Sequence, residues 1–137
     1  MGYPLDTAAQ NAGLQAWFGV VDRTPTLPAS WEVALFTDHP LLGGTELTSA
    51  GGYARLVVAN TSANFPAAVA GLITSAQLLW PDPTAAYSDT ARFFVLYDHA
   101  DSITRWYVGV LGGEIDVNGA QPGFATTLSI HFNTEGA

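Results

Sequence analysis

Glycine, proline, asparagine and aspartate divide the chain into short apolar segments, and this division limits the folds open to it. The clearest segment is the last one. Every second residue in it belongs to a mainly apolar set (Phe124, Thr126, Leu128, Ile130 and Phe132), and the residues between them are smaller or more polar. Such alternation indicates a strand with one buried face. Comparable segments lie at 31–37, 53–59, 72–80, 91–97 and 103–111, with a shorter one at 114–117. Six or seven short strands separated by turn residues predict a small antiparallel β-sandwich or barrel.

One of these segments has a definite place in the predicted sheet. Residues 91–97 are apolar on both faces, which is typical of a central strand covered on both sides. Residues 98–102 combine two aspartates with a serine and predict a turn. Residues 103–111 are therefore expected to return as the hairpin partner of 91–97.

The first 30 residues differ from the rest of the chain. They contain a set of apolar residues with helical spacing (Leu14, Trp17, Phe18 and Val21). Pro25 and Pro28 then exclude helix and predict an extended linker. We expect residues 1–30 to form a short helix and linker, and residues 31–137 to form the β-sandwich domain. The apolar helix face packs either on its own domain or on a neighbouring subunit.

The charge balance excludes two classes of partner. Twelve acidic residues and four arginines, with no lysine, give the chain a net charge of −8. The arginines are scattered, so the sequence offers no basic patch for nucleic acid or for an anionic membrane surface. It also has no apolar stretch of about 18 residues that would span a membrane, and the first residues lack the order of a secretory signal peptide.

The sequence lacks the arrangements that common enzymes and metal sites require. It has no cysteine, and therefore no thiolate nucleophile or thiolate zinc site. His39, His99 and His131 are not spaced as a metal-binding motif. A small hydrolase would need two converging carboxylates, and the candidate pairs are Asp82 with Asp89 and Glu114 with Asp116. We expect no catalytic activity, no metal and no cofactor.

A glycine-rich segment precedes the second predicted strand. Residues 38–52 read as a long loop, in which the glycine pair 51–52 suits positive φ or close backbone approach. Tyr53 then places its ring at the strand start, with its hydroxyl near water. Arg55 lies on the same face and can pair with Glu46 across the loop. The loop is a corner that fixes the strand, a contact with a neighbouring subunit, or both.

Short motifs around this loop occur in a characteristic order. They are Val-Ala-Leu-Phe-Thr (33–37), Thr-Glu-Leu-Thr (45–48), Gly-Gly-Tyr-Ala-Arg (51–55), Asn-Phe-Pro (64–66) and an aromatic hairpin from Phe93 to Val110. This order resembles a family of small virion proteins of tailed bacteriophages, labelled tail-fibre or minor-tail proteins. The resemblance covers about residues 11–132. Ala50 departs from the family pattern, which has glycine or serine before the Gly-Gly-Tyr motif.

The resemblance implies a non-enzymatic virion protein that binds neighbouring virion subunits in many copies. Its partners would be major capsid or tail proteins and further copies of itself. Related small sandwiches decorate phage heads, so both a head decoration (cement) role and a tail-fibre or minor-tail role are implied. The compact chain has no heptad segment for a fibre shaft, which favours head decoration. The candidate subunit contacts are Leu14, Trp17, Phe18, His39, Glu46, Tyr53 and Arg55.

A carbohydrate-binding module for host-surface recognition is the alternative class. Four tryptophans and five tyrosines on a small acidic β-sandwich could stack on sugar rings. Trp31 and Trp106 lie inside apolar strands, where a core position is expected. Trp80 precedes Pro81 at a strand end, so it is expected to be exposed and is the candidate glycan contact.

Overall fold

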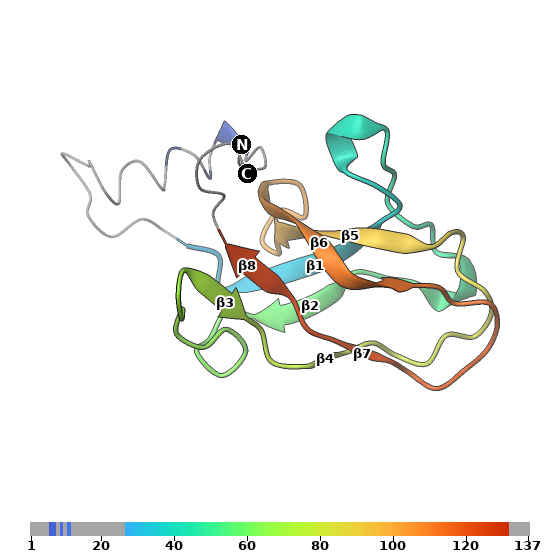
Figure 1. Ribbon diagram of the computed structural model, residues 1–137. Helices are drawn as coiled ribbons and strands as arrows, with labels where there is room; N and C mark the ends of the chain where they lie inside the picture. The colour runs from blue at the N-terminus through green and yellow to red at the C-terminus, as the bar shows by residue number, and fades with distance from the viewer. Residues whose placement is uncertain (1–5, 8, 10, 12–26, 132–137) are drawn as a thin grey trace.

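The computed structural model describes residues 6, 7, 9, 11 and 27–131 and shows a mainly β protein (Figure 1). Its strands are β1 (Ser30–Phe36), β2 (Leu56–Ala59), β3 (Leu72–Thr74), β4 (Leu78–Leu79), β5 (Ala91–Asp98), β6 (Arg105–Ile115), β7 (Ala125–Thr126) and β8 (Ser129–His131). Every strand pair is antiparallel, which confirms the predicted fold class. The expected helix face that includes Leu14, Trp17 and Phe18 lies outside the described residues. Within the described part, no helix is long and apolar enough to cross a membrane.

Four strands form the main sheet in the order β2-β1-β5-β6. Ala34 of β1 lies opposite Val95 of β5, and Val95 in turn lies opposite Val108 of β6. β5 is buried on both faces, because Phe94 belongs to one core cluster and Val95 to the other. This confirms the central, doubly covered strand that the apolar sequence predicted.

A two-stranded ribbon faces the sheet, with β3 paired to β8 and β4 paired to β7 (Figure 1). The sequence predicted single strands at 72–80 and in the last segment, whereas the structure divides each of them in two. The division is a bulge at Ser75, where the register shifts by one residue. The Ser75 hydroxyl accepts a hydrogen bond from the Leu128 N–H at 2.8 Å. A side chain thus satisfies a backbone donor where the ladder is interrupted.

The main core lies between the sheet and the ribbon. Both layers supply its buried side chains (among them Val33, Leu35, Phe94 and Leu96 from the sheet, and Leu78, Trp80 and Leu128 from the ribbon side). Trp80 is only 3% exposed, and its ring stacks on Tyr53 at 6.3 Å and on Phe124 at 5.9 Å between centroids. The expectation of an exposed Trp80 is therefore wrong. Residues 78 and 80 face the same side of the extended chain, and that side is the core.

Asp6, near the N-terminus, contacts the free edge of β6. The Asp6 N–H donates to the Arg105 carbonyl at 3.1 Å, and the Asp6 carboxylate accepts from the Arg105 N–H at 2.5 Å. A longer ion pair of 3.6 Å joins the two side chains. Asp6, which belongs to the predicted N-terminal segment, is therefore bound to the β domain.

Candidate functional site

The loop between β1 and β2 is fixed to the sheet by the predicted ion pair of Glu46 and Arg55. The pair is bidentate: Arg55 Nε lies 2.8 Å from Glu46 Oε1, and Nη2 lies 2.9 Å from Oε2. Both side chains are about three-quarters covered. Hydrogen bonds and the charge of Glu46 raise the pKa of Arg55, so the guanidinium is a permanent cation in this position.

Arg55 is also the centre of a larger cluster. Its Nη1 donates to Glu32 Oε1 at 3.1 Å and to the Ser102 carbonyl at 2.8 Å. The guanidinium carbon lies 3.9 Å from the centroid of the Tyr97 ring, which is the geometry of a cation–π contact. One side chain thereby ties together the β1–β2 loop, strands β1 and β5, and the turn before β6.

Glu32 is the buried acid of this cluster and is 7% exposed. Its Oε2 accepts from the Ser102 hydroxyl at 2.6 Å and lies 2.8 Å from His99 Nδ1. Burial raises the pKa of Glu32, but the bonds from Ser102, His99 and Arg55 outweigh it and hold the pKa below its ordinary value. We call the whole cluster the Arg55 network (Glu32, Glu46, Tyr53, Arg55, Tyr97, His99 and Ser102).

The hydroxyl of Tyr53 lies inside the protein, which corrects the expectation that it faces water. Tyr53 is 6% exposed. Its hydroxyl accepts from the Leu35 N–H at 2.9 Å and donates to Glu46 Oε1 at 3.1 Å. The physical reason is the length of β2, which pairs with β1 only as far as Val33 and Leu56. Beyond that point Leu47 of the loop donates to the Leu35 carbonyl at 3.0 Å, and the tyrosine accepts the Leu35 N–H in place of a strand carbonyl.

The glycine pair before Tyr53 behaves as predicted. Gly51 and Gly52 have φ of +68° and +79°, a region that other residues rarely adopt. A side chain on Gly51 would also collide with the carbonyl oxygens of Ala85 and Ala86. The Gly51 carbonyl accepts from the Thr84 N–H at 3.0 Å. Both proposed reasons for glycine, positive φ and close backbone approach, are confirmed here.

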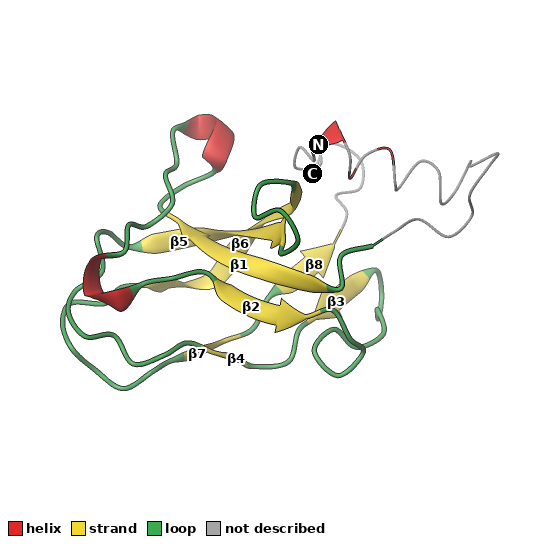
Figure 2. Cartoon of the chain, turned by 180° about the vertical axis from the view of Figure 1, so that it is seen from behind, coloured by secondary structure: helices red, strands yellow, loops and turns green. Residues whose placement is uncertain are grey.

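The first part of the β1–β2 loop, directly after β1, projects beyond the strands and carries two exposed leucines. Figure 2 shows η1 (Pro40–Leu42) at the tip of this projection. Leu41 and Leu42 are 61% and 77% exposed. His39 Nδ1 accepts from the Leu41 N–H at 3.1 Å, and the imidazole packs edge-on against Phe93. Gly43 then reverses the chain with φ of +87°.

Hydrogen bonds join the two arms of the chain at the base of this projection. The Thr37 N–H donates to the Thr45 carbonyl at 3.0 Å, and the Thr45 N–H donates to the Thr37 hydroxyl at 3.1 Å. The Gly44 N–H donates to the His39 carbonyl at 3.0 Å. We call residues 37–45 the Leu41–Leu42 loop. Its apolar tip is held in place by its own backbone bonds and by the core contact of His39.

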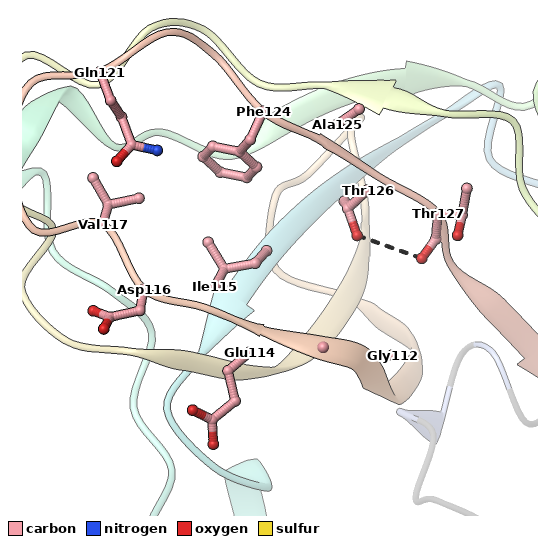
Figure 3. A pocket seen from close by; sticks show the side chains of 11 residues that line it. Gly112, Glu114, Ile115, Asp116, Val117, Gln121, Phe124, Ala125, Thr126 and Thr127 are labelled. Atoms are coloured by element: carbon pink, nitrogen blue, oxygen red, sulfur yellow. Dashed lines mark hydrogen bonds between the residues drawn. The ribbon is translucent and has the colours of Figure 1, made fainter.

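A shallow groove of about 470 Å³ lies between the end of β6 and β7 (Figure 3). Its lining mixes apolar and polar side chains (Ile115, Val117, Phe124, Glu114, Asp116, Gln121, Thr126 and Thr127, with Gly112 and Gly113). In Figure 3 the Phe124 ring and Ile115 face the same space as Gln121, while the two carboxylates lie at the rim. The groove thus places one aromatic ring beside amide, hydroxyl and carboxylate groups.

The acidic pairs considered for hydrolysis are used in other ways. Glu114 forms an exposed ion pair with Arg92 at 2.9 Å. Asp82 accepts the Gly123 N–H at 2.5 Å, and Asp89 accepts the Thr90 N–H at 2.7 Å. Among the described residues, no group of three metal-ligating side chains comes together. These contacts are those of turns and surface pairs.

The structure brings together only some of the candidate subunit contacts. Glu46, Tyr53 and Arg55 meet in one network, while His39 is buried at the base of the Leu41–Leu42 loop. A contact of any of these residues with a neighbouring subunit stays a prediction. Sequence reasoning did not find Glu32 as a partner of Arg55, although a single acid inside the apolar segment 31–37 is a signal for a buried ion pair.

Comparison with protein families places the chain among the structural proteins of phage virions. The family model described as podophage GP4 fiber I protein gp80 matches residues 4–121, and the chain belongs to this family. The match ends before β7 and β8. It supports the resemblance to phage fibre-type proteins and implies a location in the virion. No curated protein matches the chain.

Proposed function

We propose that the chain is a non-enzymatic component of a phage tail fibre, and that its Leu41–Leu42 loop attaches it to a neighbouring virion protein. The fibre family supports a tail role over the head decoration role that the compact sequence favoured. The observation that carries the attachment site is the exposure of two adjacent leucines on a loop whose base is hydrogen-bonded.

The physical argument rests on preorganisation. An apolar tip held in one conformation loses little conformational entropy on binding, so its burial is converted more fully into affinity. Burial of two leucines would contribute about 3–6 kcal/mol before other terms. Many copies on one virion would add avidity to such a single contact. The partner is expected to present an apolar pocket of matching size.

The test is a phage that encodes Leu41→Ser and Leu42→Ser in this chain. We expect purified variant virions to contain less of the chain by quantitative mass spectrometry, and immunogold label on the wild-type virion to lie on the tail. The matched control is Ile103→Ser, which removes a 75% exposed apolar side chain from the turn before β6. Normal incorporation of the double variant would refute the attachment site, and label on the head would refute the fibre role.

A second candidate function is recognition of a host-surface carbohydrate in the groove between β6 and β7. Trp80 cannot supply the aromatic surface, but the groove offers the Phe124 ring next to amide and hydroxyl groups. We expect titration with oligosaccharides from host cell surfaces to shift the NMR signals of the groove, and Gln121→Ala to weaken that response. Gln77→Ala, on the exposed side of the ribbon, is the control. No shift with any oligosaccharide would refute this function.

A further inference from the structure

The ribbon formed by β3, β4, β7 and β8 has an outward face that carries no charged side chain. The chain has no Asp, Glu, Lys or Arg between Arg55 and Asp82, and none between Asp116 and Glu135. The ribbon is built wholly from these two stretches. All sixteen charged residues of a chain with net charge −8 lie outside them.

Alternation along the ribbon separates a core side from an exposed side. The exposed side chains are apolar or small and uncharged, apart from one histidine at the end (Leu72, Thr74, Gln77, Leu79, Ala125, Thr127, Ser129 and His131). Leu79 is 71% exposed, and Val69, in the tight turn that leads into β3, is 76% exposed. The described part therefore has an uncharged face that ends at Asp82 and the acidic rim of the groove.

Other parts of the same molecule occupy backbone groups along the edges of the ribbon. Leu72 of β3 is hydrogen-bonded to the turn that precedes it, and the Ala76 N–H donates to the Asn64 carbonyl at 2.8 Å. The Tyr107 hydroxyl bonds to both the N–H and the carbonyl of His131 in β8. A second chain would therefore meet the ribbon mainly through the side chains of its outward face, where no charge opposes its approach.

We infer that this ribbon face binds a second copy of the chain. Charge selects this occupant: two copies that each carry −8 repel one another through any acidic face, but not where both faces are uncharged. A twofold axis would place each ribbon on the other, so that Leu79 and Leu72 of the two copies come close together. This contact is separate from the Leu41–Leu42 loop, and each can fail without the other.

The expected affinity follows from the size of the face. Residues 72–80 span roughly 30 Å at about 3.3 Å per residue, so the ribbon alone is at the small end of stable interfaces. A weak, concentration-dependent association is therefore expected. Screening of the remaining acidic charge by salt should strengthen the association.

The test is sedimentation velocity of the full chain at rising concentration, with wild type compared with Leu79→Glu. We expect wild type to form dimers that are favoured by added salt, and Leu79→Glu to weaken dimerisation by about tenfold or more. Ile103→Glu is the control, because it adds the same charge at an equally exposed position elsewhere. Circular dichroism establishes that each variant is folded.

A second measurement keeps the inference open to refutation if Leu79→Glu fails to fold. Amide hydrogen exchange of wild type at low and high concentration should show protection gained in β3, β4, β7 and β8 only at high concentration. The inference is overturned if wild type stays monomeric at about 500 µM, if Leu79→Glu dimerises as wild type does, or if protection appears elsewhere. Capture of a different virion protein by this face in a monomeric chain would also overturn it.

Discussion

The Tyr53 hydroxyl bonds to the Leu35 N–H at 2.9 Å, at the position where a neighbouring strand would otherwise accept it. The same hydroxyl donates to Glu46 and so joins the sheet edge to the Arg55 network. Burial is the main cause that raises the pKa of this tyrosine, so it remains a neutral donor at all physiological pH values. One side chain thus completes the ladder and orients the carboxylate that holds the loop.

Tyr53→Phe is expected to destabilise the protein by about 1–3 kcal/mol, because it leaves the buried Leu35 N–H without its acceptor. Urea denaturation followed by tryptophan fluorescence measures the change. Tyr87→Phe is the matched control, since this ring is also buried but its hydroxyl has no hydrogen-bond partner among the described residues. Equal stability of the two variants would show that the Tyr53 bond contributes nothing.

Much of the fold follows from local sequence pattern, and the errors occur where the partner is distant. Alternation located the buried face of the last segment, and the glycine pair 51–52 marked a backbone requirement. The pair of Glu46 and Arg55 was predictable because Glu46 lies in the loop and Arg55 follows it by only a few residues. These features depend on residues close together in the chain.

The incorrect expectations concern side chains whose environment is set by other elements. Trp80 was expected outside because of Pro81, but Phe124, from a segment more than 40 residues away, stacks on it. The Tyr53 hydroxyl was expected near water, although the early end of β2 leaves Leu35 for it to satisfy. No local pattern gives the length of a neighbouring strand, so these contacts need the structure.

Arg55→Lys is expected to destabilise the protein by about 1–2 kcal/mol, because lysine cannot make the bidentate bond to Glu46 or stack flat on Tyr97. The exposed pair of Arg92 and Glu114 offers the control, and Arg92→Lys should change stability by less than about 0.5 kcal/mol. Thermal unfolding of the two variants in the same buffer compares them directly. A smaller loss for Arg55→Lys than for Arg92→Lys would contradict the role given to the network.

Gly51→Ala is expected to cost about 1–3 kcal/mol or more, since it adds strain at positive φ to a collision with the Ala85 carbonyl. The loss should appear as a lower midpoint of thermal unfolding. Gly113→Ala is the control, because a methyl group there would meet no atom within 4 Å. If both variants unfold at the wild-type temperature, the corner is not held by the backbone contact described.

The last prediction concerns acid stability and the buried carboxylate of Glu32. Its pKa in the folded protein lies below the ordinary value of 4.5, so folding favours the charged form. The stability this provides is present above about pH 4.5 and is lost as the pH falls through the lower folded value. Glu32→Gln should therefore reduce stability at pH 7 and flatten the fall in unfolding free energy between neutral pH and about pH 3.

Urea unfolding at a series of pH values measures both effects of Glu32→Gln. Ser102→Ala tests the cause, because it removes one donor to the carboxylate and should move the pKa of Glu32 back up. Its profile is expected to lie between those of wild type and Glu32→Gln. Parallel profiles for all three proteins would mean that the Arg55 network does not stabilise the charged form of Glu32.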